Sequence, residues 1–191
     1  MAVNLPISSQ QKEHAYYTYV EQHPSYRDKA SLLQYCKNEG LNTNYCILVN
    51  YSIRSGLPRF FIYDFNKQRI IYRCRCAHGL GGGSTARKAV FSNSYGSRCS
   101  SLGKFAISGV GSAHFINCFR LNGLDSTNSN AARRGVLIHS GRNVTKHKLL
   151  PWMFLSKSCE GCFTITKEGL LKLHDIYEKE DNKRILVYAY V

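Results

Sequence analysis

The stretch NYCILVNYSIRSGLPRFFIYDFNKQRIIYRCRCA (44–77) decides the fold class of this chain. It contains three runs rich in β-branched and aromatic residues, at 45–54, 58–65 and 68–77, a composition typical of β-strands. Asn66 and Lys67 fit a turn between the second and third runs. The chain has 191 residues and 43% apolar residues, which predicts one folded domain with a sizeable core.

The same strand-like composition continues toward the C-terminus. Further strands are expected at 104–109, 114–121, 135–139, 162–166 and 184–191. A helix is expected near 167–179, where apolar side chains recur at helical spacing. We therefore predict a mainly β domain over residues 45–191.

The N-terminal residues 1–44 differ in character and predict a short helical extension. Ser8 and Gln11 have the spacing of a capping box, and a helix to about His23 fits the residues that follow. A second helix fits Ser25 to Glu39, because Ser25 is a favourable N-cap and Gly40 stands just past the end.

The eight cysteines invite a disulfide or zinc interpretation, but their density is below that of a disulfide scaffold. In QRIIYRCRCA (68–77), Ile70, Tyr72, Cys74 and Cys76 alternate with arginines. Alternation places these four on one face of a strand. Cys74 and Cys76 are therefore expected in the core, and most of the other cysteines as buried thiols.

The net charge of +14 is concentrated in the middle of the chain. Residues 65–159 contain fifteen Lys and Arg against a single acid, Asp125, whereas the flanking segments are nearly neutral. Such a field favours an anionic partner, whether nucleic acid, a polyanionic polymer or a carboxylate-rich substrate.

A membrane protein and a nucleotide-binding protein both find little support in the sequence. No stretch reaches the roughly 18 apolar residues of a membrane span, and the N-terminus lacks the pattern of a secretory signal. The glycine-rich HGLGGGSTARKAV (78–90) lacks the Gly-Lys-Ser/Thr ending of a P-loop. No acid follows it at the spacing that a dinucleotide site uses, so we interpret it as a flexible basic loop.

SKSCEGCFTI (156–165) contains a Cys-x-x-Cys that allows three interpretations. A zinc site would combine Cys159 and Cys162 with Cys74 and Cys76, or with His139, although a second knuckle is missing. A redox pair would have to open a helix, whereas CFTIT has the composition of a strand. The third interpretation makes Cys162 a nucleophile.

The third interpretation pairs Cys162 with His139, which ends the apolar strand of GVLIHSG (135–141). An imidazole can take the thiol proton and later protonate a leaving amine. Gly161 allows the backbone to come close enough for N–H groups to bind an oxyanion.

Several motifs in this order resemble the L,D-transpeptidase catalytic-domain family of murein enzymes. They are CILVNYSI (46–53), AHG (77–79), FSNSYGSRCSSLG (91–103), RLNGLD (120–125), NAARRGVLIH (130–139) and CEGC (159–162). The resemblance covers about residues 45–165. It implies a mainly β, two-sheet fold for the domain.

The resemblance also implies a mechanism. Cys162 would attack the carbonyl of the third residue of a peptidoglycan tetrapeptide stem, and His139 would be its base. The N–H groups of Gly161 and Cys162 would stabilise the oxyanion, and D-alanine would leave. A second stem's amine would then form a 3→3 crosslink, or water would make the protein an L,D-carboxypeptidase. Substrate-binding residues would be Ser140, Arg142, Cys159 and Ser101.

The resemblance requires no metal or cofactor and no nucleic acid, favours a monomer, and implies a periplasmic or cell-envelope location. The chain departs from the family pattern near the nucleophile. Cys159 replaces the usual Ser or Thr, Glu160 replaces a His or aromatic residue, and Phe163 is also unusual. The alternative from another class is a basic zinc-ribbon module that binds nucleic acid, which leaves the GVLIH and SSLG motifs without a role.

Overall fold

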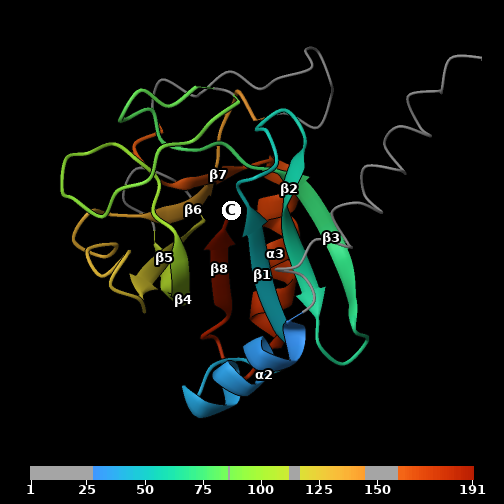
Figure 1. The fold of residues 1–191 in the computed structure, drawn as a ribbon. Helices are drawn as coiled ribbons and strands as arrows, with labels where there is room; N and C mark the ends of the chain where they lie inside the picture. The colour runs from blue at the N-terminus through green and yellow to red at the C-terminus, as the bar shows by residue number, and fades with distance from the viewer. Residues whose placement is uncertain (1–27, 86, 112–116, 145–158) are drawn as a thin grey trace, which may run out of the picture.

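The computed structural model describes residues 28–85, 87–111, 117–144 and 159–191 (Figure 1). These residues form two helices and eight strands. In chain order they are α2 (Lys29–Asn38), β1 (Tyr45–Asn50), β2 (Pro58–Asp64), β3 (Arg69–Arg75), β4 (Gly103–Gly111), β5 (Cys118–Gly123), β6 (Leu137–Ser140), β7 (Phe163–Ile165), α3 (Lys167–Lys179) and β8 (Leu186–Tyr190). The mainly β fold predicted from the sequence is confirmed. The helix expected at 8–23 lies outside the described residues.

The eight strands form one sheet in the order β3-β2-β1-β8-β4-β5-β6-β7. The C-terminal strand β8 lies in the middle, parallel to β1 on one side and antiparallel to β4 on the other (Figure 1). The two sheets expected from the family resemblance are thus two halves of one curved sheet, because β8 joins them.

The two edges of the sheet meet beside β7. Cys76, just past the end of β3, forms an antiparallel bridge to Ile165 in β7. The N–H of Ala77 donates to the carbonyl of Thr164 at 2.8 Å. The sheet is therefore barrel-like, and β7 is held from both sides.

A hydrophobic core fills the inner face of the curved sheet, and α3 packs into it against β3 and β6. Thr166 caps α3, since its side chain accepts the N–H of Gly169 at 3.1 Å. Gly169 is required there, because a Cβ would lie 2.7 Å from the sulfur of Cys74. Both Cys74 and Cys76 belong to this core, as predicted.

The sequence predicted the wrong face for one residue of β3. The pairing between β2 and β3 shifts register between Ile62 and Tyr63, so that Ile62 pairs with Tyr72 and Tyr63 with Ile70. Such a bulge breaks the alternation of side chains. Ile70 therefore packs on the opposite face from Tyr72.

Helix α2 covers the outer face of the sheet. Its side chains Leu32 and Cys36 join a second hydrophobic cluster with side chains from β1, β2 and β8. The helix ends where the sequence predicted, since Gly40 has the positive φ of +60° typical of a residue just past a helix. The boundary proposed between residues 44 and 45 stays a prediction.

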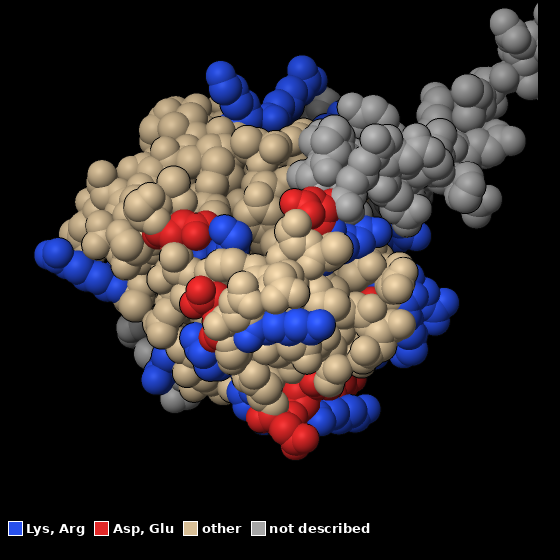
Figure 2. Space-filling model, turned by 60° about the horizontal axis from the view of Figure 1, so that its bottom comes forward, with Lys and Arg blue, Asp and Glu red and all other residues tan. Residues whose placement is uncertain are grey.

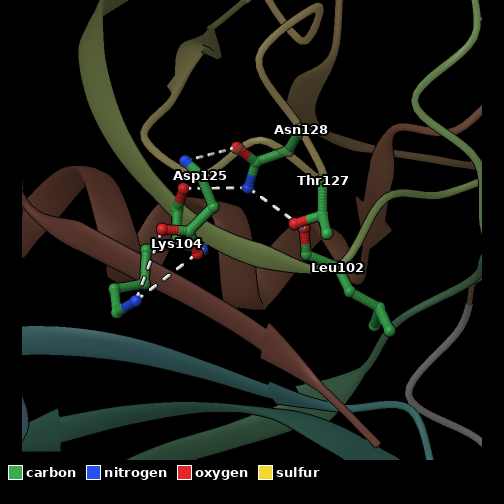
Figure 3. Close-up of polar contacts among 5 residues, drawn as sticks. All are labelled: Leu102, Lys104, Asp125, Thr127 and Asn128. Carbon is green, nitrogen blue, oxygen red and sulfur yellow. Dashed lines mark hydrogen bonds and ion pairs between the residues drawn. The ribbon is translucent and has the colours of Figure 1, made fainter.

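A polar network fixes the segment between β5 and β6 to the start of β4 (Figure 3). The carboxylate of Asp125 accepts the backbone N–H of Lys104 at 2.7 Å. The amide of Asn128 donates to the carbonyls of Leu102 and Lys104, at 3.1 and 2.9 Å. Asp125, the single acid of residues 65–159, is therefore a structural residue, and its network anchors the segment that leads into β6.

The described residues show charges of both signs on the α2 end of the molecule. Figure 2 turns this end toward the viewer, with Lys and Arg side chains interspersed with Asp and Glu. Neither of the two described helices has the length and apolar content to cross a membrane.

Candidate active site

Strands β6 and β7 lie side by side and place His139, Thr164 and Cys162 on one face. The two strands are parallel, and His139 pairs with Thr164. Paired residues of a parallel ladder point to the same side, and Cys162 stands two residues before Thr164, immediately before β7 begins at Phe163. Ile138, Phe163 and Ile165 point the other way into the inner core. The candidate nucleophile and base thus share the outer face of two adjacent strands.

His139 is buried, with 3% of its surface exposed, and its tautomer follows from its partners. Nδ1 lies 2.9 Å from the carbonyl oxygen of Ser140, which can only accept, so Nδ1 carries the proton. Nε2 is then the basic atom of the neutral ring, and it lies 3.3 Å from the Thr164 hydroxyl. Burial lowers the pKa of His139 below 6.5, so the ring is neutral at pH 7.

Cys162 differs from the other seven cysteines, which are buried thiols as expected, because it is half-exposed. Its thiol donates weakly to the carbonyl of Gly135 at 3.6 Å. The desolvation of the sulfur raises the pKa of Cys162 to about 12, although the N–H of Leu137 and the charge of Arg134 act to lower it. At neutral pH the pair therefore rests as thiol and imidazole, and the thiolate forms only when the proton is transferred.

Cys159 is fully buried in a small cluster with Ala77 and Val144. Its sulfur accepts the Thr164 hydroxyl at 3.5 Å and donates to the carbonyl of Cys162 at 3.4 Å. Burial raises the pKa of Cys159, while the Thr164 hydroxyl and the N–H groups of Gly161 and Cys162 lower it. Cys159 is thus placed as an internal support of the turn that presents Cys162.

Cys159 also affects the two N–H groups that the resemblance predicts as oxyanion donors. The N–H groups of Gly161 and Cys162 act on the Cys159 thiol, since both lower its pKa. A thiol sulfur is a weak acceptor, and an oxyanion is a much stronger one. Their use as oxyanion donors therefore requires these two N–H groups to exchange a weak partner for a charged one.

Gly161 occupies a position that only glycine fits. Its φ is +111°, and an added Cβ would lie 2.4 Å from the carbonyl oxygen of Cys99 and 3.0 Å from Nη2 of Arg134. Residues with a Cβ rarely adopt this φ. The glycine therefore packs the nucleophile turn directly against the segment around Cys99.

The remaining residues expected to bind substrate fall in different environments. Arg142 is exposed in the turn after β6. Ser140 points away from His139, since the two are neighbours in a strand. Ser101 is 2% exposed, and its hydroxyl donates to the carbonyl of Ser92 at 2.9 Å and accepts from Arg134 at 2.6 Å. The strand register places His139 and Cys162 on the same side of β6 and β7, and the Ser101 side chain lies inside the protein. A direct contact between the Cys162 sulfur and the His139 imidazole stays a prediction.

Two arginines close to the nucleophile turn were missed by sequence reasoning. Arg134 donates to backbone carbonyls of the segment 92–99, and Arg98 forms an ion pair with Glu160 at 3.0 Å. Their only sequence signal was membership of the basic middle segment, which does not distinguish them from other arginines.

The basic residues of the middle segment are distributed over the described surface. Arg98, Arg134 and Arg142 lie in the segments that adjoin Cys162 and His139. Lys67 and Arg69 stand at the start of β3, at the opposite end from Cys76, which bridges to β7. If the basic excess attracts an anionic substrate, it should surround the site, and this stays a prediction.

A buried Arg59–His78 pair connects β2 to the glycine-rich segment after β3. Arg59, 1% exposed, donates to the carbonyls of Cys76 and Ile53 and to Nδ1 of His78, the last at 2.6 Å. Nε2 of His78 then donates to the carbonyl of Thr85 at 2.8 Å. Burial and the Arg59 charge lower the pKa of His78 to about 4, so this histidine stays neutral. The pair ties the glycine-rich loop to the sheet.

Within the described residues, His, Cys, Asp and Glu side chains form no group of three that could hold a metal ion. Cys74 and Cys76 point into the main core, whereas Cys159 belongs to a separate cluster with Ala77 and Val144. The four-cysteine zinc arrangement considered from the sequence is thus not assembled by these residues.

Comparison with known protein families identifies the family to which this chain belongs. A family model described as the L,D-transpeptidase catalytic domain matches residues 20–190. Because this match spans most of the chain, the protein belongs to the L,D-transpeptidase catalytic-domain family. As a member, it is an enzyme of the class that acts on peptidoglycan.

Among solved structures, the chain is similar to an L,D-transpeptidase (residues 123–326) from Xylanimonas cellulosilytica. The two sequences are 12% identical, the alignment covers 82% of this chain and 68% of that one, and the TM-score is 0.43. No protein of curated function matches the chain.

Proposed function

We propose that this protein is a cysteine L,D-transpeptidase that acts on the tetrapeptide stems of peptidoglycan and forms 3→3 crosslinks. The observation that carries the proposal is the placement of Cys162 and His139 on one face of adjacent strands, in a member of this family. The neutral, basic Nε2 of His139 and the half-exposed thiol of Cys162 are the two groups that acyl transfer needs.

The first half of the reaction makes a thioester. Nε2 of His139 takes the proton of Cys162 as the sulfur attacks the carbonyl of the L-centred third residue of the stem. The tetrahedral oxyanion that forms takes the N–H groups of Gly161 and Cys162 as donors. As it collapses, the carbon–nitrogen bond breaks, His139 gives its proton to the amine, and D-alanine leaves.

The second half resolves the thioester. The side-chain amine of a second stem attacks the same carbonyl, His139 accepts its proton, and the thiol of Cys162 is restored with a 3→3 peptide bond formed. If water attacks in place of the amine, the product is a tripeptide and the activity is that of an L,D-carboxypeptidase. This chemistry takes place at the wall, so the proposed location is the periplasm or cell envelope.

Of the four residues expected to bind substrate, Arg142 is proposed to contact it directly and the other three to act through their neighbours. Arg142 is exposed after β6 and is a candidate anchor for a stem carboxylate. Ser140 and Cys159 act on the substrate through the dyad. Cys159 supports the turn that carries Cys162, and the carbonyl of Ser140 fixes the tautomer of His139. Ser101 acts indirectly, through its hydrogen bond to Arg134.

The direct test incubates the protein with purified disaccharide tetrapeptides and analyses the products by mass. Crosslinked dimers and free D-alanine support transpeptidation, and tripeptide with D-alanine alone assigns the carboxypeptidase activity. No D-alanine from any tetrapeptide would contradict both.

A second test identifies the nucleophile by intact mass after exposure to a carbapenem. Cys162→Ala is expected to lose all labelling, because the other seven thiols are buried. Cys159→Ser is expected to keep substantial labelling, since a hydroxyl can accept the same N–H groups. Equal labelling of the wild type and Cys162→Ala would rule out Cys162.

A further inference from the structure

Arg134 precedes β6 by three residues, and its guanidinium reaches back to the segment 92–101. Nη1 donates to the carbonyl of Ser92 at 2.8 Å and to the hydroxyl of Ser101 at 2.6 Å. Nη2 donates to the carbonyl of Cys99 at 2.5 Å. Three acceptors from three residues thus hold one side chain in a fixed fork geometry.

The segment that Arg134 holds is closed on itself. Phe91 and Ser100 form a parallel bridge, and the N–H of Ser92 donates to the carbonyl of Ser100 at 3.0 Å. The hydroxyl of Ser101 donates to the carbonyl of Ser92, so it must accept from Arg134. The donor and the acceptor of each hydrogen bond at Ser101 are therefore defined.

Arg134 also adjoins the turn that presents the nucleophile. A Cβ on Gly161 would lie 3.0 Å from Nη2 of Arg134 and 2.4 Å from the Cys99 carbonyl that Nη2 binds. The next residue after Arg134, Gly135, accepts the thiol of Cys162 through its carbonyl. Two consecutive residues thus contact the nucleophile turn at Gly161 and at Cys162.

The charge of Arg134 acts on the sulfur as well. It lowers the pKa of Cys162, although burial raises that pKa more. Burial lowers the pKa of Arg134, whereas the Cys162 thiolate in turn acts to raise it. Arg134 is itself half-buried, so water screens its charge less than it screens an exposed arginine. The N-terminal neighbour Arg133 is exposed and lies over the ring of Tyr95 at 5.4 Å.

We propose that Arg134 is a positioning residue of the active site, which holds the Cys99 carbonyl against Gly161 and keeps a positive charge beside the Cys162 sulfur while the thiolate forms. The importance of this role for turnover rests on the proposed transpeptidase function. The effect of Arg134 on the thiol itself does not.

The test compares three variants by the rate at which iodoacetamide alkylates Cys162 at pH 8, followed peptide by peptide with mass spectrometry. Arg134→Gln removes the charge and is expected to slow alkylation about tenfold, the effect of a one-unit rise in the pKa of a thiol. Arg134→Lys keeps the charge and is expected to stay within about threefold of the wild type on the same scale. Arg133→Gln is the matched control and should not change the rate.

The proposal is overturned if Arg134→Gln is alkylated as fast as Arg133→Gln, or if Arg134→Lys is slowed as much as Arg134→Gln. Circular dichroism establishes that each variant is folded. If Arg134→Gln does not fold, the test uses Arg134→Lys instead, and the kcat and KM of D-alanine release are measured. A kcat reduced roughly fivefold, as expected for one lost hydrogen bond, with an unchanged KM supports positioning. An unchanged kcat overturns it.

Alkylation uses no peptidoglycan, which separates the two hypotheses. A wild-type protein that released no D-alanine would contradict the proposed function. The alkylation rates would still decide the role of Arg134.

Discussion

Substituting Gly161 by alanine is expected to destabilise the protein strongly, because two separate effects act at this position. Its φ of +111° is a conformation that costs a residue with a Cβ about 1–3 kcal/mol. The new Cβ would also lie 2.4 Å from the carbonyl oxygen of Cys99, a backbone atom that cannot rotate away. Overpacking of this kind costs about 1–3 kcal/mol more.

The expected loss for Gly161→Ala is therefore about 2–6 kcal/mol in the free energy of unfolding. Gly96→Ala is the matched control in the segment that Gly161 contacts. Gly96 has a φ of +73°, but nothing lies within 4 Å of an added Cβ. It should lose only the conformational part, about 1–2 kcal/mol.

Urea unfolding of the wild type and both variants measures the difference, with the m-value checked for a two-state transition. Carbapenem labelling of Cys162 in Gly161→Ala should also fall, because the clash displaces the turn on which Cys162 stands. If the two variants lost the same free energy, the close approach of Gly161 to Cys99 would play no part in stability, and the argument from packing would be refuted.

Two pH dependences complete the expectations. Because burial lowers the pKa of His139 below 6.5, the rate of carbapenem acylation should rise through a midpoint below pH 6.5 and stay constant to neutral pH, and a midpoint above 6.5 would contradict this. The pKa of His78 is lowered to about 4, so the unfolded state binds its proton first as the pH falls. In urea unfolding, the protein should therefore lose about 3 kcal/mol of stability between pH 6.5 and 4. His78→Gln should remove most of this loss. The same pH dependence in both proteins would exclude His78 as its source.

Local patterns in the sequence were sufficient for most of the secondary structure. The runs at 45–54, 58–65 and 68–77 became β1, β2 and β3, and the helix expected at 167–179 has those bounds as α3. These elements are readable because each depends on the composition and spacing of a few neighbouring residues. The bulge in β3 is an exception, because a shift of register depends on the partner strand, which the sequence of one strand does not reveal.

The candidate dyad was also available from the sequence, through the strand ending in His139 and the Gly-Cys at the start of a second strand. What the sequence could not supply was the relation between them. That β6 and β7 are adjacent and parallel, so that His139 pairs with Thr164 and shares a face with Cys162, is a property of the sheet order.

The sequence by itself determined the mainly β class and the family, and it supplied the candidates for the catalytic residues, because side-chain type and local periodicity are properties of the chain. Tertiary structure alone decided the supports of the site. Arg134 meets the Cys99 carbonyl from 35 residues away, and Arg59 meets His78 across a hairpin. Such contacts join segments through the fold of the sheet, so neither residue type nor spacing could distinguish Arg134 from Arg133 beside it.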